Sequence, residues 1–288
     1  MDDVVYYINS VPRTLWGRED GMTSQESQDL VTMSPGVGNA YANAWRQLWP
    51  RFLDLLLAGI VYVAMVVPVG IIFGLVFTLD WASSATWGLD FSGVSNAYVD
   101  LPWGAQVVDA VINIIYFTPL MYGLLFVALA AARADRYDLG NIFVAFKRNY
   151  VNVIIVGVLF WLIFSLPSLI ISLVTSAVPI LGAFLAIAWV ILAVILYCKL
   201  AFVPFLLTDR TMGATESIRT SWQWTNGHAL EIFVILLLAV PILIAGVIAF
   251  VVGVIPAIMW VALAVASQYH AVSLQREAHV AYPSPMVP

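Results

Sequence analysis

The chain has 288 residues, of which 62% are hydrophobic and 10% are charged, whereas a soluble domain usually carries about a quarter charged residues. This composition excludes a water-exposed globular fold and predicts an all-α, polytopic membrane protein. The net charge of −5 says little about orientation, which follows the positions of Lys and Arg.

Residues 1–40 form a predicted cytoplasmic N-terminal extension of mixed, mostly polar composition. We expect a tail that is partly disordered or lies on the membrane surface. A sharper alternative is a docking segment for a partner, because large apolar groups such as Tyr6, Tyr7, Ile8 and Trp16 are costly to leave in water. The start of the chain lacks a basic n-region, so we expect no cleavable signal peptide.

Six apolar runs lie within a predicted membrane domain of residues 41–275. Each approaches or exceeds the ~20 apolar residues that a helix needs to cross ~30 Å of hydrocarbon. Such runs are stable in lipid only as helices, which satisfy their own backbone hydrogen bonds. The predicted spans are about 52–79, 107–132, 151–174, 179–207, 232–252 and 255–274. The last two leave almost no loop, so we expect a tight turn near Gly253–Pro256; residues 276–288 are a predicted cytoplasmic tail.

The basic residues lie on alternate connections. They precede the first span, recur between spans two and three and between spans four and five, and follow span six, while Lys199 lies near the inner end of span four. The connections after spans one, three and five contain no Lys or Arg. Because Lys and Arg favour the cytoplasmic side, this pattern predicts a prokaryotic inner-membrane protein with both termini in the cytoplasm.

An aromatic and basic segment leads into each odd-numbered span, at about residues 44–52, 145–150 and 218–224. Trp with Arg or Lys anchors amphipathic segments among lipid headgroups. We therefore predict three hairpins, each preceded by a cytoplasmic interfacial amphipathic segment. Common ancestry of the three units and convergent anchoring both remain open. The predicted anchors in these segments are Trp45, Arg46, Phe146, Lys147, Arg148, Arg219 and Trp222.

Prolines interrupt five of the spans, and each removes a backbone donor and tends to kink a helix. Kinks mark moving parts or a cavity in some membrane proteins, but prolines are also frequent in ordinary membrane helices. The five are Pro68, Pro119, Pro167, Pro204 and Pro241.

Few polar residues lie inside the spans, where ionisable groups are expensive and often functional. The weak polar-site candidates are Asp109, Asn113 and Lys199. Asn113 lies about one turn beyond Asp109, so the two share a helix face, and Lys199 can extend its long stem to the inner interface. Asp54 and Glu231 begin spans one and five, where a carboxylate complements the helix N-terminus.

His270 closes a polar group, Gln268-Tyr269-His270, near the inner end of span six. It is a weak candidate for a metal, haem or pigment ligand, although a lone His is more often a satisfied polar contact. The single cysteine, Cys198, lies in span four and is expected to pack there. Without Cys or carboxylates at ligand spacing, the sequence predicts no metal and no cofactor.

The common catalytic motifs are absent from the sequence, including zinc-protease, serine-hydrolase, phosphate-loop and dinucleotide-binding patterns. We therefore expect no enzymatic activity, and no nucleic-acid partner. The predicted mid-membrane positions are almost entirely apolar, which argues against an ion-coupled transporter.

The segment 202–228 carries the most specific pattern in the chain. Its residues are Pro204, Asp209, Gly213, Glu216, Ile218, Arg219, Ser221, Trp222, Thr225 and Gly227, with Ser217 beside them. In this pattern the chain resembles a broad group of uncharacterised bacterial and archaeal six-helix membrane proteins. These are similar in turn to the membrane domain attached to some glycerophosphodiester phosphodiesterases, which usually have Ala where Ser217 stands. The resemblance extends as topology over about residues 40–275 and implies a fold rather than a chemistry; without the soluble hydrolase domain, we expect no phosphodiesterase activity.

The same pattern has a structural interpretation. We expect Thr211 or Thr215 to cap a short helix, Glu216 to pair with Arg219, and Gly227 to allow the turn into span five.

Three functions follow as hypotheses. The leading one is a non-enzymatic accessory, assembly or scaffolding subunit, which contacts the lipid bilayer and binds other membrane-protein subunits through its cytoplasmic face and N-terminal extension. A transporter or lipid-handling protein with a cavity between the hairpins is the alternative, and a pigment- or haem-binding subunit is the third.

Overall fold

A computed structural model describes residues 34–82, 103–135, 138–248 and 253–281, and these are helical or in turns, with no strand among them. The predictions for the N-terminal docking segment, most of the outer connection after the first span, and the end of the tail fall outside the described residues. Six helices are long and apolar enough to cross a membrane, which confirms the prediction of six candidate spans and is consistent with a multi-pass membrane protein.

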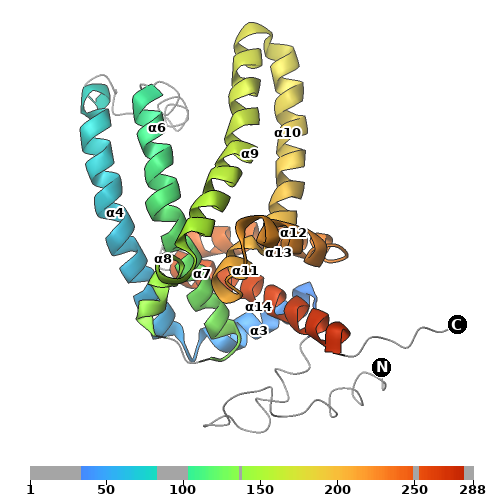
Figure 1. Cartoon of the computed structure of the whole chain (residues 1–288). Helices are drawn as coiled ribbons and strands as arrows, with labels where there is room; N and C mark the ends of the chain where they lie inside the picture. Colours follow the sequence, from blue (N-terminus) through green and yellow to red (C-terminus); the bar gives the residue numbers. More distant parts are fainter. Residues whose placement is uncertain (1–33, 83–102, 136–137, 249–252, 282–288) are drawn as a thin grey trace, which may run out of the picture.

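The first two spans stand upright beside one another (Figure 1). The first is α4, Phe52–Ala82, which contains Pro68. The second is one continuous rod made of α6, Trp103–Ile112, the π-helical segment η2, Asn113–Phe117, and α7, Thr118–Ala132.

Pro119 explains the π-helical segment. It cannot donate to the carbonyl of Ile115, four residues earlier, and the turn widens just before it. The hydroxyl of Tyr150, on the next span, donates to that freed carbonyl at 3.1 Å. A neighbouring helix thus satisfies the group that proline leaves bare, as is usual in lipid.

The next two spans are α9, Tyr150–Ala177, and α10, Pro179–Leu200, with only Val178 between them. They meet closely at this end, because a Cβ on Gly182 would lie 2.5 Å from the Cα of Thr175. The predicted fourth span at 179–207 agrees with the apolar stretch Pro179–Asp209, but this stretch is not one continuous helix. The helix breaks after Leu200, and a separate helix α11, Val203–Asp209, starts with Pro204 in its first turn.

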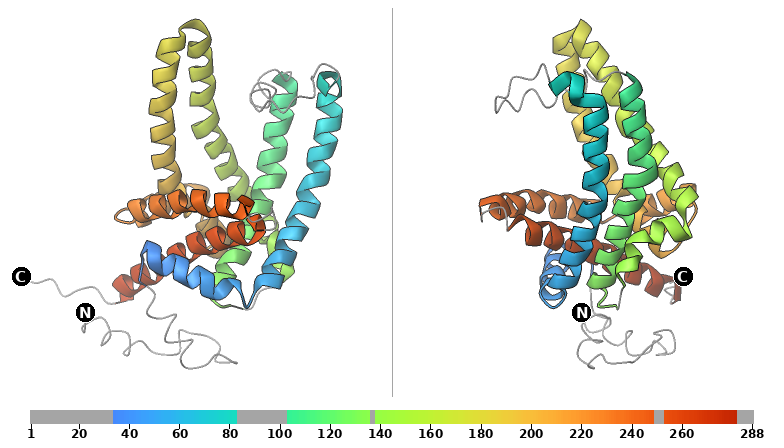
Figure 2. Two further views of the ribbon diagram at one scale, coloured as in Figure 1. Left: turned by 180° about the vertical axis from the view of Figure 1, so that it is seen from behind. Right: turned by 90° about the vertical axis from the view of Figure 1, so that its left-hand side faces the viewer.

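The last two spans are α13, Ala229–Ile248, and α14, Val254–Ala281. They pack on each other but run across the four upright helices instead of alongside them (Figure 2). The arrangement of all six as three hairpins therefore stays a prediction. α14 continues to Ala281, so it extends a few residues into the predicted tail of residues 276–288.

Four short helices lie at the lower end of the upright spans (Figure 1). They are α3, Val37–Leu48, the 3₁₀ turn η3, Leu139–Phe143, α8, Val144–Arg148, and α12, Ala214–Trp224. Each predicted interfacial segment falls in or next to one of them, but their position at a membrane surface stays a prediction. α3 begins at Val37, within the predicted N-terminal extension of residues 1–40.

We call α3, α7, η3, α8, α11, α12, α13 and α14 the base, and the pairs α4–α6 and α9–α10 the two arms. The main core lies in the base, where α14 packs against α3, α7 and α11. Gly123 of α7 admits the backbone of η3 so closely that a Cβ there would lie 1.7 Å from the carbonyl oxygen of Ile142. The core therefore surrounds α14, which carries the polar residues described next.

Candidate functional site

Four consecutive polar residues, Ser267 to His270, form a belt around α14, and all four are buried. Successive residues of an α-helix point about 100° apart, so four in a row face most of the way around the helix. Each one binds a different part of the base. We call these four residues the polar belt.

The first two belt residues bind α3 and α13. Ser267 accepts a hydrogen bond from the side-chain amide of Asn43 at 2.9 Å, and Asn43 also donates to the carbonyl of Ala132 at the end of α7. Gln268 donates to Glu231 at 2.6 Å and accepts from the backbone N–H of Gly36 at 3.1 Å. These contacts satisfy helix-terminal groups that would otherwise lack partners.

Tyr269 donates a hydrogen bond to the carboxylate of a bidentate ion pair between Arg133 and Asp209. Arg133, just after α7, holds both carboxylate oxygens of Asp209 at 2.6 and 2.8 Å, and the Tyr269 hydroxyl donates to the same carboxylate at 3.1 Å. The pair is mostly buried, with 21% and 15% of the two side chains exposed. Burial alone would lower the pKa of Arg133, but the hydrogen bond to Asp209 and the charge of its carboxylate outweigh this effect. The pKa is raised above its usual value, so the guanidinium stays charged.

His270 completes the belt. The Nε of Arg133 donates to Nδ1 of His270 at 3.3 Å, so this nitrogen is the unprotonated one, and the ring is neutral with its proton on Nε2. A guanidinium this close disfavours a bound metal cation. No group of three or more His, Cys, Asp or Glu that could hold a metal lies in the described part of the chain.

An aromatic stack joins the belt to α11 and α12. The Tyr269 ring lies between Phe205, with centroids 5.0 Å apart, and Trp224, 6.0 Å away. The guanidinium of Arg210 lies 4.9 Å above the Trp224 ring and also pairs with Glu277. Cation–π and ring contacts of this kind add to the burial of large apolar surface.

The pattern in α12 proves to be a clamp on the end of α10. Ser221 donates to the carbonyl of Lys199 at 2.8 Å. The hydroxyl of Thr225, one turn further on, lies 3.3 Å from the same carbonyl and 2.9 Å from the carbonyl of Ser221. That carbonyl lies in the last turn of α10 and lacks an intrahelical partner there. Gly227 takes a φ of +90° in the turn before α13, which confirms the reason for a glycine at this position.

Two expectations for α12 are wrong. Gly213 precedes the helix and neither Thr211 nor Thr215 caps it; the side-chain oxygen of Asn152, on α9, accepts from the N–H of Ala214 at 3.3 Å instead. Glu216 and Arg219, both exposed, form no ion pair among the described residues, and an exposed pair would gain little.

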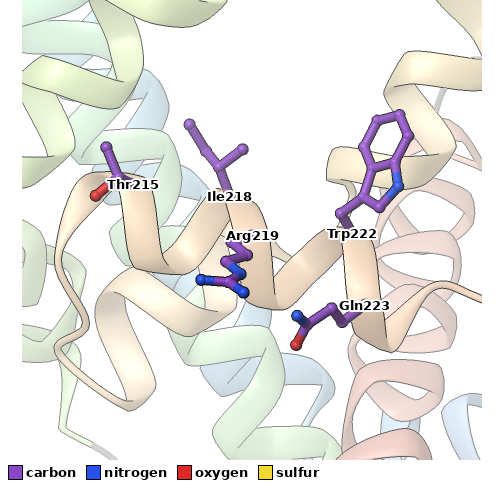
Figure 3. Close-up of a pocket in the computed structure, with 5 residues that line it drawn as sticks. All are labelled: Thr215, Ile218, Arg219, Trp222 and Gln223. Atoms are coloured by element: carbon purple, nitrogen blue, oxygen red, sulfur yellow. The ribbon is translucent and has the colours of Figure 1, made fainter.

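Lys199 lies beside Trp222. Its ammonium group donates to Asn226 at 2.6 Å and lies 5.6 Å from the centre of the Trp222 ring. Trp222 is itself exposed and lines a hollow on α12 of about 460 Å³, together with Thr215, Ile218, Arg219 and Gln223 (Figure 3).

The other predicted anchors are spread over the base. The rings of Trp45 and Trp260, on α14, lie 4.9 Å apart, and Phe146 stacks on Tyr150 at 5.4 Å. The basic anchors fall in the last turns of α3 and α8, and those of α8 are exposed. They are Arg46, Lys147 and Arg148.

Asp109 lies on α6 and Asn113 begins η2, in the second span. The side chain of Asn113 donates to the backbone carbonyl of Asp109 at 2.9 Å, so the two share a helix face as predicted. The structure does not bring them together with His270. Cys198 is buried in α10.

Sequence reasoning missed the central role of Arg133, because the basic residues between spans two and three were used only to predict the orientation of the chain in the membrane. An arginine that immediately follows an apolar span, with an aspartate ending another, was the available signal. No family model, no curated protein and no solved structure matches this chain.

Proposed function

We propose that this protein is a non-enzymatic accessory, assembly or scaffolding subunit of a larger complex in a prokaryotic inner membrane, with both termini in the cytoplasm. The observation that carries the proposal is the contrast in burial between its helices. The most apolar part of α14 is 61% buried within the chain, whereas those of the α9 and α10 spans are only 11% and 6% buried.

The polar groups of the base support a structural role. The belt residues bind Asn43, Glu231, Asp209 and Arg133, so their hydrogen bonds are used within the chain. A catalytic site needs a nucleophile or a base that is free to meet a substrate. Here the buried groups are engaged in holding helices together.

The α9–α10 arm supports binding to another protein. An apolar groove of about 510 Å³ lies between this arm and α13, and its lining is apolar or aromatic. The lining includes Phe164, Trp189, Tyr197, Phe233 and Leu237. Large aromatic side chains are frequent at protein interfaces, and in lipid helices associate through close packing. We infer that side chains of a partner's membrane helix enter this groove.

Photo-crosslinking tests the proposal. A photoreactive phenylalanine analogue replaces Val194, which lines the groove, in cells that produce the full chain at native level. The matched control replaces Val151, which is also exposed but lies outside the groove, at the start of α9. We expect one discrete protein adduct from position 194 and none from 151. Adducts of position 194 with lipid only, or the same adducts from both positions, would overturn the proposal.

The orientation has its own test. Reporter fusions after Ala281 and after Val178 should report opposite sides of the membrane, with the C-terminal fusion in the cytoplasm. An external C-terminus contradicts the proposed topology. The proposed membership in the six-helix group rests on the 202–228 pattern, whose Ser221, Thr225 and Gly227 have the clamp and turn roles described above.

A further inference from the structure

The hollow on α12 combines an apolar side with a polar one. Ile218 and Trp222 are four residues apart and point to the same side of the helix, towards the rising α9 and α10 (Figure 3). Arg219 and Gln223, also four residues apart, point to another side. The helix therefore presents apolar groups towards the arm and polar groups away from it.

Two cations flank this hollow. Arg219 is exposed and has no ion pair among the residues that the structure describes, and Lys199 binds a neutral amide, that of Asn226, close to Trp222. The nearby acid on α12, Glu216, precedes Arg219 by three residues and does not pair with it. The hollow thus carries positive charge that no carboxylate of its own helix neutralises by contact.

The level of the hollow fits the boundary between hydrocarbon and headgroups. α10 is apolar up to Lys199 and ends at Leu200, and a span ends where the polar headgroup region starts. Trp and basic residues gather at this depth. Arg binds phosphate through two parallel N–H donors, which suits it to a phosphodiester.

We propose that the α12 hollow binds one anionic phospholipid, with its phosphate on Arg219 near Lys199 and the start of an acyl chain against Ile218 and Trp222. The proposal depends on the membrane placement of the chain and is independent of any protein partner. A soluble phosphate ion would contact only the cations, and the acidic side chains of a peptide would not contact the apolar surface that faces the arm. A lipid uses both sides of the hollow.

Native mass spectrometry of the full chain tests the site. Protein purified in mild detergent is titrated with phosphatidylglycerol and, separately, with phosphatidylcholine, and the first bound lipid is counted. One basic residue near a membrane surface contributes roughly fivefold in affinity for an anionic lipid. We therefore expect Arg219→Gln to weaken the first phosphatidylglycerol about fivefold and to affect phosphatidylcholine less.

A matched control separates the site from general surface charge. Arg148→Gln removes an exposed arginine from the last turn of α8, on another helix of the base, and should leave the first phosphatidylglycerol unchanged. Trp222→Leu, which keeps both cations, should also weaken it, because the ring faces the acyl chain. Excess inorganic phosphate should not displace the lipid.

Three results would overturn the proposal. The first is an equal loss of affinity for phosphatidylglycerol in Arg219→Gln and Arg148→Gln. The second is displacement of the lipid by inorganic phosphate alone, and the third is the same affinity for the first phosphatidylglycerol in wild type and Arg219→Gln. A failure here leaves the crosslinking result at position 194 untouched, so the two proposals fail separately.

Discussion

The base and the two arms of this protein are held together by different interactions. In the base, side-chain hydrogen bonds connect α14 to α3, α11 and α13. Arg133 and Tyr269 both donate to the carboxylate of Asp209. In the α9–α10 arm the contacts are a glycine against Thr175 and the rings of Phe164 and Trp189, with one side-chain hydrogen bond from Trp189 to Ser168.

The difference follows from the surroundings of each region. Lipid tails are as apolar as the helices, so hydrophobic burial does not drive the arms together and small residues with close packing must do so. In the base, buried polar groups gain from one another but become costly when one partner is lost. We therefore expect single substitutions to destabilise the base more than the arms, and the following predictions test that order.

The largest effect should come from Asp209→Asn. This change leaves Arg133 mostly buried without its anionic partner, and removal of one member of a buried pair costs roughly 3 kcal/mol. We expect that loss in the free energy of unfolding, measured by SDS-induced unfolding in mixed micelles. Glu216→Gln, the same change at an exposed carboxylate of α12, should leave stability within about 0.5 kcal/mol. Equal losses from both would show that the Arg133–Asp209 pair does not stabilise the base.

Gly123→Ala should have the next largest effect. A Cβ at this position meets the carbonyl of Ile142, so α7 and η3 must move apart, and we expect a loss of about 1–3 kcal/mol. Gly70→Ala on α4 is the matched change in an arm, where no atom lies within 4 Å of the new Cβ. There stability should stay the same or rise by up to about 1 kcal/mol, because Ala is the better helix former. A neutral Gly123→Ala would mean that the base is not tightly packed at η3.

The sequence predicts the arms better than the base. Long apolar runs identify α4 and α9 within a few residues, and the start of α10, because the need to cross lipid sets both their length and their composition. The same signal also marks α13 and α14, which run across the arms (Figure 2). Apolarity measures exclusion from water, and a helix buried in protein shows it as well as a helix in lipid.

The belt was only partly predictable. Gln268, Tyr269 and His270 stand out because polar residues are rare in an apolar run, but their partners lie 37 to 232 residues away along the chain. Local spacing carries no information about such pairs. The prediction of a cap for α12 was wrong for the same reason, because Asn152, which accepts from the N–H of Ala214, belongs to a different helix.

The clamp of α12 on α10 lies where base and arm meet, and its effect should be intermediate. Thr225→Val alone should cost little, because Ser221 keeps its bond to the carbonyl of Lys199. Ser221→Ala alone should also cost little, because the Thr225 hydroxyl can turn from the carbonyl of Ser221 to that of Lys199. Together they leave that carbonyl without a donor, and we expect a loss of about 1.5 kcal/mol, larger than the sum of the two. Additive single effects, measured in the same SDS assay, would show that the two hydroxyls do not share one acceptor.

The smallest effect should come from Tyr150→Phe, which tests how the two arms are joined. The lost hydroxyl donates to the carbonyl that Pro119 leaves free, and side-chain hydrogen bonds within membrane proteins average about 0.6 kcal/mol. In a Pro119→Ala background the backbone N–H of residue 119 can serve Ile115 instead, so the cost of Tyr150→Phe should fall towards zero. A double-mutant cycle measures this coupling directly. If Tyr150→Phe costs the same in both backgrounds, the hydroxyl stabilises α9 by some other contact, and the proline does not create the need for it.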